Sequence, residues 1–258
     1  MMLKILIDNG LQAGDVVCFA NTGREDEATL KFVHECETRW GVPVVWLEYR
    51  HAAPKYEIVN FHTASRKDNP RPFDELLKHR RYLPNPTQRL CTADLKIKTI
   101  RRYVRTVLKH RGEIPTFIGL RFDEPERVAR KKAQNAVGKE SEFCLMPLYE
   151  MRVTVRERNA FWAAQPFDLE INSYADNCDL CFMKGKWQNI LKIREDPAAA
   201  DWWIEKEKQA APSAKRRRNG QFRKEYSYAE LKHIALTQTH IQFPEQSREI
   251  SLTCSCTD

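Results

Sequence analysis

Two cysteines stand three positions apart in the stretch NCDLCFMKGKW, residues 177–187. Cys178 and Cys181 can present two thiolates from one turn, which is a frequent opening for zinc or iron–sulfur ligation. The same spacing occurs in redox dithiols and in turns without special chemistry. The other cysteines that can reach this pair decide between these interpretations.

Six further cysteines lie along the chain. Cys91 directly precedes a predicted helix, where the helix dipole favours a thiolate. Cys254 and Cys256, in the final LTCSCTD, supply one or two more donors. Four thiolates would close a zinc site or hold a [4Fe–4S] cluster, and ligand type alone does not decide between the two. The other three lie among apolar residues and are predicted to belong to the core: Cys18, Cys36 and Cys144.

Polar residues follow the first predicted strand in FANTGREDEAT, residues 19–29. In open α/β sheets, ligands bind at the carboxyl ends of the strands. Asn21, Thr22 and Gly23 would present backbone amides and a hydroxyl there. This segment is therefore a candidate anion site, with an ordinary strand-to-helix turn as the alternative.

A second polar segment, GLRFDEPERVAR at residues 119–130, follows another predicted strand. The guanidinium of Arg121 has the planar fork that binds phosphate or sulfate oxygens in pairs. The alternative is a charged helix whose own carboxylates neutralise its arginines. Two polar turns after two parallel strands favour an anion site at this edge of the sheet.

The elements that must position these residues follow from hydrophobic periodicity. Residues 15–21 and 42–50 are apolar runs typical of buried strands, and residues 24–41 between them have helical spacing. A third strand is predicted at 114–120. This β-α-β alternation predicts an α/β fold, a Rossmann-like parallel sheet with flanking helices.

The remaining segments are predicted to be loop and helix. Residues 51–90 are typical of a loop with one short helix near its end, and a basic helix is predicted at 92–112. Beyond residue 150 the chain is predicted to be mainly helical, at 154–165, 186–209 and 227–238. We therefore expect an α/β domain at residues 1–150 and a helical, cysteine-containing region at residues 151–258.

The chain has 258 residues, a formal net charge of +8 and a sequence pI near 9.1. Such a balance favours anionic partners such as nucleotides or nucleic acid, and a solvated basic surface is the alternative. No apolar run approaches the ~20 residues needed to cross a bilayer, and MMLKILIDNG is unlike a secretory signal. We expect a cytoplasmic protein without a membrane partner, in which a disulfide framework is not favoured.

Taken in order, these segments resemble the phosphoadenosine phosphosulfate reductase-like family, within the adenine nucleotide alpha-hydrolase (PP-loop ATP pyrophosphatase) group. VVCFANTGREDEATLKFVHECETRWG resembles the family's strand, TG turn and helix, and RLCTADLKIKTIRRYV its cysteine-then-lysine helix. IGLRFDEPERVAR is similar to its G-x-R-x-x-E-x-x-R segment, MPLYEMRVTVRE to its Pro-Leu segment, and CDLCFMKG to its later cysteine pair. The resemblance spans roughly residues 15–195.

The resemblance implies an enzyme that binds an adenine nucleotide, ATP or phosphoadenylyl sulfate, at the carboxyl edge of the sheet. The reaction it implies is sulfur transfer or reduction on an adenylyl-activated substrate, with a thiol as the candidate electron donor. The nucleotide-binding residues would be Asn21, Thr22, Gly23, Lys96 and Arg121.

The resemblance also implies a [4Fe–4S] cluster, with zinc as the alternative. Its ligands would be thiolates from distant segments: Cys91, Cys178, Cys181 and Cys256. The two tail cysteines can exchange roles, and we assign Cys254 as the nucleophile, which needs a reachable thiolate. Arg121 would be the second catalytic residue.

Two features depart from the family pattern. The family's phosphate loop, Ser-Gly-Gly-x-Asp-Ser or a variant, is not found, and neither is the strand before it. Either the start codon is placed too far downstream, or this is a truncated, inactive or repurposed member. The ending CSCTD also differs from the Glu-Cys-Gly-Leu-His ending of the assimilatory reductases.

Relatives in DNA phosphorothioation and tRNA thiolation activate a nucleic-acid target. The alternative function is therefore a nucleic-acid-modifying or nucleic-acid-binding protein with a structural four-cysteine metal site. Its support is the net charge, the basic helix at 96–111 and the run KRRR at 215–218. DNA or tRNA would then be the partner, and its binding would weaken as salt rises.

Overall fold

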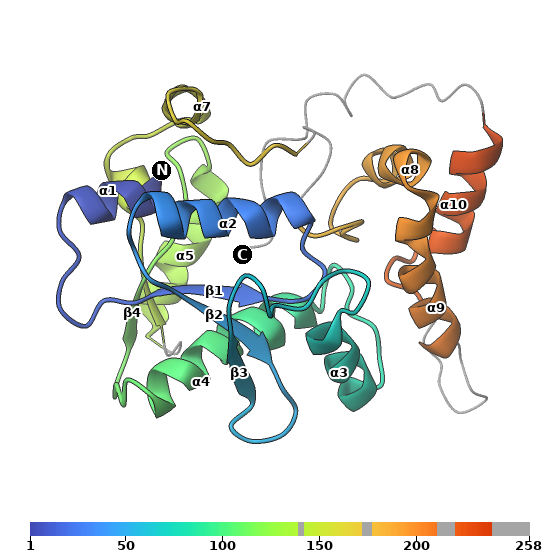
Figure 1. Ribbon diagram of the computed structural model, residues 1–258, viewed down its shortest axis with the longest axis horizontal. Helices are drawn as coiled ribbons and strands as arrows, with labels where there is room; N and C mark the ends of the chain where they lie inside the picture. Colours follow the sequence, from blue (N-terminus) through green and yellow to red (C-terminus); the bar gives the residue numbers. More distant parts are fainter. Residues whose placement is uncertain (139–141, 172–176, 211–219, 239–258) are drawn as a thin grey trace.

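A computed structural model describes residues 1–138, 142–171, 177–210 and 220–238 (Figure 1). It is a mixed α/β structure in which helices outnumber strands and surround two small sheets. The mixed α/β class predicted from the sequence is confirmed. The cysteines of the tail, Cys254 and Cys256, and the basic run at 215–218 lie outside the described residues.

The larger sheet contains β1 (Val17–Asn21), β2 (Val44–Tyr49) and β3 (Tyr56–Val59) in that order. β1 and β2 are parallel, with Ala20 opposite Leu47, so both strands end at the same edge of the sheet. β3 is antiparallel to β2. The predicted parallel pair is confirmed, whereas β3 lies in a segment that was expected to be loop.

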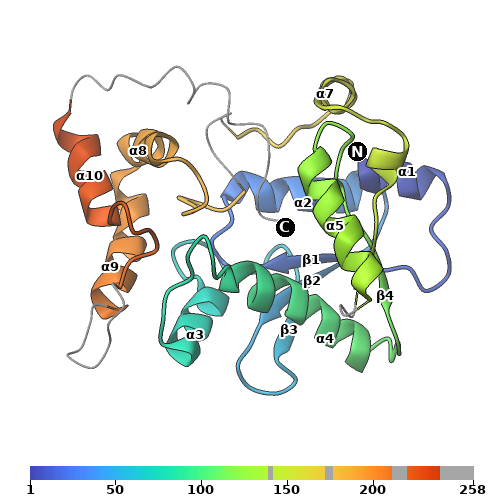
Figure 2. The same ribbon diagram turned by 180° about the vertical axis from the view of Figure 1, so that it is seen from behind.

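Helices cover both faces of this sheet, as Figures 1 and 2 show. Because successive side chains of a strand point to opposite faces, Trp46 packs with Leu30 of α2 (Glu27–Arg39), whereas Leu47 packs with Tyr103 and Val104 of α4 (Lys98–Thr106). The two clusters form the layers above and below the sheet. α3 (Arg71–Arg80) lies beside α4 on the same side.

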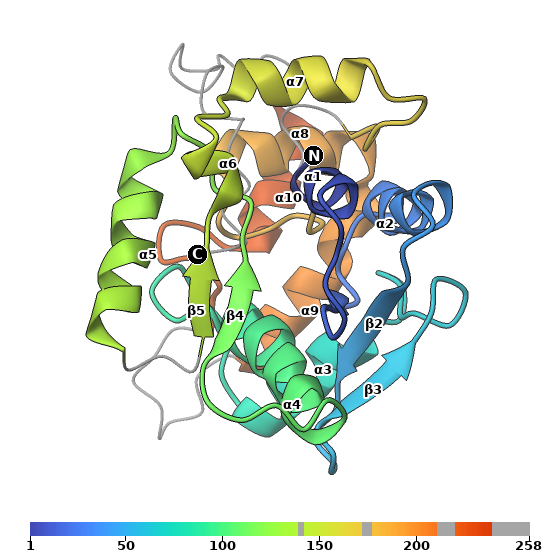
Figure 3. The ribbon, with the colours of Figure 1, turned by 90° about the vertical axis from the view of Figure 1, so that its left-hand side faces the viewer.

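The smaller sheet pairs β4 (Ile114–Phe117) with β5 (Glu142–Leu145) in parallel. In the described part of the chain the strands form these two separate sheets, and no pairing joins β1 to β4. A single Rossmann-like sheet is therefore not confirmed. α5 (Pro125–Val137) flanks β5, and α6 (Pro147–Glu150) follows the end of that strand (Figure 3).

Two further helices lie close to α2, α1 (Met2–Asp8) beside it and α7 (Val155–Ala163) on the side away from the larger sheet (Figure 3). α1 brings the Met2 side chain to Gly119, close to the smaller sheet. The rings of α7 pack on α2, with Trp162 4.9 Å from Phe32 between ring centroids. The predicted division of the chain after residue 150 stays a prediction, and α7 contacts the α/β part directly.

The last helices share a core of their own. α8 (Lys186–Glu195), the 3₁₀ turn η2 (Pro197–Ala200), α9 (Asp201–Ala210) and α10 (Tyr228–Thr237) pack around the buried rings of Trp203 and Tyr228. Buried Glu207 accepts hydrogen bonds from the backbone amides of Phe222 and Tyr228 at 3.2 and 2.8 Å. The helix predicted at 186–209 is thus broken, since η2 begins at Pro197 and proline interrupts a helix.

The helix predicted at 92–112 also differs from the structure. It begins as a π-helical segment, η1 (Cys91–Ile97), continues as α4 and ends at Thr106. The Thr99 hydroxyl donates to the Asp94 carbonyl at 2.9 Å, five residues back, and an inserted side chain of this kind accompanies the wider π turn. No helix in the described ranges is both long and apolar enough to span a bilayer.

Candidate functional site

The polar turn after β1 and the cysteine segment are joined by backbone pairing. The Asp26 amide donates to the Asn177 carbonyl at 2.8 Å, and the Asp179 amide donates to the Arg24 carbonyl at 2.7 Å. Glu25 and Cys178 form an antiparallel bridge between these two bonds. We call this contact between residues 21–26 and 177–181 the turn–hook junction.

A buried ion pair closes the junction. Arg24 donates from Nη2 to Oδ2 of Asp179 at 2.9 Å, and both side chains are almost fully buried. The guanidinium also donates to the Lys67 carbonyl at 2.6 Å and lies over the rings of Trp202 and Trp203, 4.7 and 5.4 Å from their centroids. The turn therefore contacts the helical core as well as the hook.

The cysteine–lysine helix reaches the same junction. Lys96 Nζ lies 3.4 Å from Oε1 of buried Glu25. The other oxygen of Glu25 accepts from the amide and the hydroxyl of Thr22, at 2.9 and 2.8 Å. Three segments that are remote in sequence, the first turn, the Lys96 helix and the Cys178 hook, thus meet at the carboxyl end of β1.

Asn21 is fixed to the neighbouring strand. Its Nδ2 donates to Oε1 of Glu48 at 2.7 Å and to the Ser65 carbonyl at 2.9 Å. Glu48, in β2, is fully buried and also accepts from Arg50 at 3.0 Å and from the Ser65 hydroxyl at 2.8 Å. The carboxyl ends of β1 and β2 therefore carry a buried polar network.

In the predicted nucleotide-binding turn, the backbone amides donate hydrogen bonds to side chains of the turn itself. The Gly23 amide donates to Oδ1 of Asn21 at 3.0 Å, and the Arg24 amide donates to the Thr22 hydroxyl at 3.2 Å. With the Thr22 amide on Glu25, three successive N–H groups have partners inside the turn. The geometry therefore places these amides in the structure of the turn, not at an open anion cradle.

Near the hook, the ammonium group of Lys192 lies close to the carboxylates of Asp26 and Asp179. Lys192 bonds to Asp26 and lies 3.6 Å from Oδ1 of Asp179. Burial favours the neutral form of Asp26, but the hydrogen bond and charge of Lys192 outweigh it and hold the pKa of Asp26 below its usual value. Burial raises the pKa of Asp179, with Arg24 and Lys192 opposing.

Several buried atoms of the junction lack hydrogen bonds. Among the described residues, eight buried side-chain nitrogen and oxygen atoms have no hydrogen-bond partner, and four of them belong to Arg24, its neighbour Glu25, and two residues that contact Arg24. They are Arg24 Nε, Glu25 Oε1, Asp179 Oδ1 and Trp203 Nε1. Two of these atoms lie in ion pairs, Glu25 Oε1 with Lys96 at 3.4 Å and Asp179 Oδ1 with Lys192 at 3.6 Å.

The hook cysteines are held from both sides. Cys181 is buried, and its carbonyl accepts from Asn189 at 3.2 Å. The Tyr228 hydroxyl donates to the Leu180 carbonyl at 2.5 Å, which ties the hook to α10. Cys91 packs at the edge of the hydrophobic cluster that contains Leu180. The structure therefore brings Cys91 to the same region as the hook.

The described thiols alone do not complete a metal site. Within the described ranges, no group of three or more His, Cys, Asp or Glu side chains is arranged to hold a metal ion. Two thiols on one turn, with a third packed at the edge of the same hydrophobic cluster, are of the donor type that a thiolate-ligated centre uses. The helix dipole was expected to favour a thiolate at Cys91, but burial raises its pKa, although Lys96 acts in the opposite direction.

The other cysteines are where the sequence predicts. Cys36 and Cys144 are buried, and Cys18 is half-buried in β1. Burial raises the pKa of both Cys18 and Cys36 to about 11, so these thiols are protonated at neutral pH.

Arg121 makes its described bonds within its own segment. Its Nε donates to Oδ1 of Asp123 at 2.9 Å, and its Nη1 lies 3.3 Å from Oε2 of Glu124. Glu124 also pairs with Arg127. The self-neutralised arrangement that was the alternative interpretation of this segment is therefore present, and Thr22 and Arg121 each bond within separate turns.

The sequence did not single out the residues that build the junction. Arg24 and Glu25 lie in the polar segment 19–29, and Asp179 lies between the two cysteines, but none of the three was predicted as a site residue. A charged side chain is normally exposed, so the sequence carries no sign that these three are buried together. The one available signal was their position beside Gly23 and Cys178.

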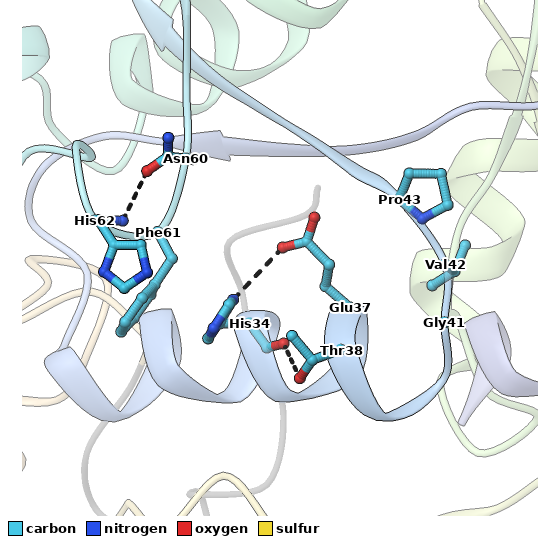
Figure 4. Close-up of a pocket in the computed structure, with 9 residues that line it drawn as sticks. All are labelled: His34, Glu37, Thr38, Gly41, Val42, Pro43, Asn60, Phe61 and His62. Atoms are coloured by element: carbon cyan, nitrogen blue, oxygen red, sulfur yellow. Dashed lines mark hydrogen bonds and ion pairs between the residues drawn. The ribbon is translucent and has the colours of Figure 1, made fainter.

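A pocket of about 490 Å³ is lined by residues of α2, of the segment before β2 and of the loop after β3 (Figure 4). The ring of His34 stacks on Phe61, with centroids 4.4 Å apart, and its Nδ1 lies 3.7 Å from Oε2 of Glu37. The pocket is lined mainly by apolar atoms and shares no residue with the turn–hook junction. No predicted site residue belongs to it.

The fold and the junction define a mixed α/β protein with a buried polar network at the carboxyl ends of two parallel strands. No family model matches the chain, and no solved structure matches it. Over 186 residues, 69% of this chain, the sequence is 28% identical to the uncharacterized nin region protein ORF290 of Escherichia phage lambda. The match covers 59% of the length of that relative.

Proposed function

We propose that the protein is an enzyme that binds an adenine nucleotide beside the turn–hook junction and performs sulfur transfer or reduction on an adenylyl-activated substrate. The observation that carries the proposal is the meeting of three remote segments at the carboxyl end of β1. That edge is where open α/β sheets bind ligands. The Rossmann-like arrangement and the cytoplasmic location expected from the sequence belong to the same proposal.

Lys96 is the residue we expect to contact the nucleotide phosphates. Its ammonium group is half-buried and faces Glu25 Oε1, which has no hydrogen bond. A phosphate that approached Lys96 would form a charge-assisted hydrogen bond with its ammonium group, in competition with the carboxylate of Glu25. Lys96 is the better supported of the two because it lies at the junction, whereas Arg121 bonds to Asp123 in a separate turn.

The thiols near the junction support a metal centre as part of this proposal. Cys91, Cys178 and Cys181 would be ligands, with Cys256 as the fourth and Cys254 as the nucleophile. A [4Fe–4S] cluster and zinc both accept thiolate donors. A protein purified without oxygen that contains iron and acid-labile sulfide would support the cluster, whereas stoichiometric zinc without iron would support the alternative.

Nucleotide binding tests the proposal directly. We expect calorimetric titration to show binding of ATP or phosphoadenylyl sulfate, and Lys96→Ala to weaken it about tenfold, which corresponds to about 1.4 kcal/mol. The matched control is Lys98→Ala, since Lys98 lies two positions further along and pairs with Asp94 at 2.7 Å. The proposal is contradicted if neither nucleotide binds, or if Lys96→Ala and Lys98→Ala weaken nucleotide binding equally.

The basic segment at 96–111, which contains α4, gives little support to the alternative of a nucleic-acid-binding protein. Along α4, Lys98 pairs with Asp94, Arg101 lies 3.6 Å from Glu142, and the Arg105 guanidinium donates to the His110 carbonyl at 2.9 Å. These three cations therefore have partners within the protein.

A further inference from the structure

An exposed and a half-buried aromatic ring form a stack with two exposed cations near the smaller sheet. Phe122, in the loop after β4, stacks on Tyr149 of α6 with ring centroids 5.7 Å apart and planes 27° apart. Lys132 of α5 lies over Tyr149, with its Nζ 4.3 Å from the ring centroid. The Arg152 guanidinium lies over Phe122 at 5.7 Å. We call these four residues the Phe122 surface.

This surface is accessible and its backbone is fixed. Phe122 is 43% exposed, and the side chains of Lys132 and Arg152 are exposed as well. The Phe122 amide donates to the Val153 carbonyl at 2.8 Å, and the Arg152 amide donates to the Tyr149 carbonyl at 3.0 Å. Both loops that carry the stack are thus held in place.

Arg152 adopts an unusual backbone conformation for this placement. Its φ of 56° lies in the left-handed region, which costs a residue with a side chain about 1–2 kcal/mol. The conformation sets the guanidinium beside Phe122. Positions of this kind recur where a side chain serves binding.

The two carboxylates that follow Phe122 in the sequence already have hydrogen-bond or ion-pair partners. Asp123 accepts from Arg121 at 2.9 Å and from the Val155 amide at 2.7 Å. Glu124 is buried between Arg121 and Arg127. Glu126 and Glu150 remain the exposed acids of α5 and α6. The ends of the aromatic stack are cationic.

We infer that the Phe122 surface binds single-stranded nucleic acid. Every base offers a flat π-face that can extend an aromatic stack, and phosphates are the complement of Lys132 and Arg152. Arg152 reaches Phe122 only at the outer range of a cation–π contact, so a base can enter beside the ring while the guanidinium binds its phosphate. An acidic peptide would match the cations but would leave Phe122 and Tyr149 without a flat partner.

This inference goes beyond the nucleotide proposal and does not depend on it. The Phe122 surface follows β4, whereas the turn–hook junction follows β1. Titration with ATP and binding of an oligonucleotide are separate measurements, so either proposal can fail while the other stands.

Fluorescence anisotropy with labelled oligo(dT) and oligo(rU), measured on the full chain between about 50 and 300 mM salt, tests the inference. We expect Phe122→Ala to weaken binding about 5- to 150-fold, the loss of one stacked base, without changing the salt dependence. Lys132→Gln and Arg152→Gln should each reduce the slope of log K against log salt by about 0.7.

Two control variants distinguish a loss of oligonucleotide affinity specific to the Phe122 surface from a loss that any similar substitution would cause. Phe143→Ala removes an aromatic ring of similar exposure, 39%, from β5, and Lys208→Gln removes an exposed cation from α9. Neither should change affinity by more than about twofold. The inference is wrong if the wild type binds no oligonucleotide, if duplex DNA binds as well as single strands, or if the Phe122 and Phe143 variants lose equal affinity. Binding to anionic vesicles that is lost in Phe122→Ala, without binding of oligonucleotides, would assign the surface to membranes and overturn the inference.

Discussion

Arg24 and Asp179 are 155 positions apart in the sequence, yet their side chains meet at 2.9 Å in the interior of the protein. Each charge is removed from water, so each depends on the other and on the surrounding hydrogen bonds. The pair fixes the turn after β1 to the hook that carries Cys178 and Cys181. The position of the two cysteines therefore depends on a residue of the first turn.

Removal of Asp179 should be strongly destabilising. Asp179→Ala leaves the buried Arg24 guanidinium without its carboxylate, and the loss of one member of a buried pair costs about 3–5 kcal/mol. Urea unfolding followed by tryptophan fluorescence measures the change. The exposed pair of Lys4 and Asp8 is the control, since Asp8→Ala should cost less than about 1 kcal/mol. Equal costs would show that the buried pair contributes no more than a surface pair.

The ion pair between Asp26 and Lys192 predicts a loss of stability in acid. The pKa of Asp26 is lower in the folded protein than its usual value because of Lys192, despite the opposing effect of burial. Its contribution to stability is therefore complete above the unfolded pKa of about 3.9 and is lost as pH falls through the folded value.

Asp26→Asn isolates this charge, because asparagine keeps the side-chain oxygen that caps α2 at the Ala28 amide. The wild type should be more stable than the variant by a constant amount between about pH 5 and 8 and by progressively less below about pH 4. Unfolding free energies across this range give the comparison. A difference that does not change with pH would exclude the ion pair as its source.

The cysteine variants test the proposed metal centre. Cys178→Ser and Cys181→Ser should each lower metal content, measured by elemental analysis of protein purified without oxygen. Cys36→Ala is the control, because Cys36 is a core thiol. Cys254→Ser and Cys256→Ser should differ, since only Cys256 is predicted to be a ligand. If every variant retains the metal content of the wild type, these thiols are not its ligands.

Local sequence signals predicted the elements that carry strong periodicity. β1, α2 and β2 follow from apolar runs and acidic helix starts, and their parallel pairing follows from the β-α-β order. β3 was missed because its four residues are partly exposed, with Ile58 57% exposed, so no clear alternation marks the strand. The π-helical segment η1 is accompanied by a hydrogen bond from the Thr99 hydroxyl to the Asp94 carbonyl, which a helical pattern does not reveal.

The candidate site was predictable in part for the same reason. The order of motifs brought attention to Thr22, Gly23, Lys96 and the hook cysteines, and the structure places these segments in one region. The side chains that join them are charged residues, whose burial depends on partners more than 100 positions away. Only the folded chain shows that Arg24 and Glu25 face inward and that the amides of the turn are already bonded.

Comparison of Gly23→Ala with Gly10→Ala distinguishes the cost of a strained backbone conformation from the cost of a steric clash at the junction. It has a φ of +79°, and a Cβ added there would lie 2.8 Å from the Pro70 Cα. Gly10 has nearly the same φ, +81°, with nothing within 4 Å of an added Cβ. Both Gly→Ala variants should lose about 1–2 kcal/mol from the left-handed conformation, but only Gly23→Ala must also displace backbone.

Pro70 is the N-cap residue of α3, so its backbone cannot rotate away as a flexible side chain would. Relief of the clash requires movement of α3 or of the turn itself, which should add about 1–3 kcal/mol to the cost. Movement of the turn would also shift Glu25 relative to Lys96 and Cys178. We therefore expect Gly23→Ala to weaken nucleotide binding and lower metal content, while Gly10→Ala leaves both unchanged. Equal stability of the two variants would show that the turn is not packed against Pro70, and the geometry of the junction described above would then be wrong.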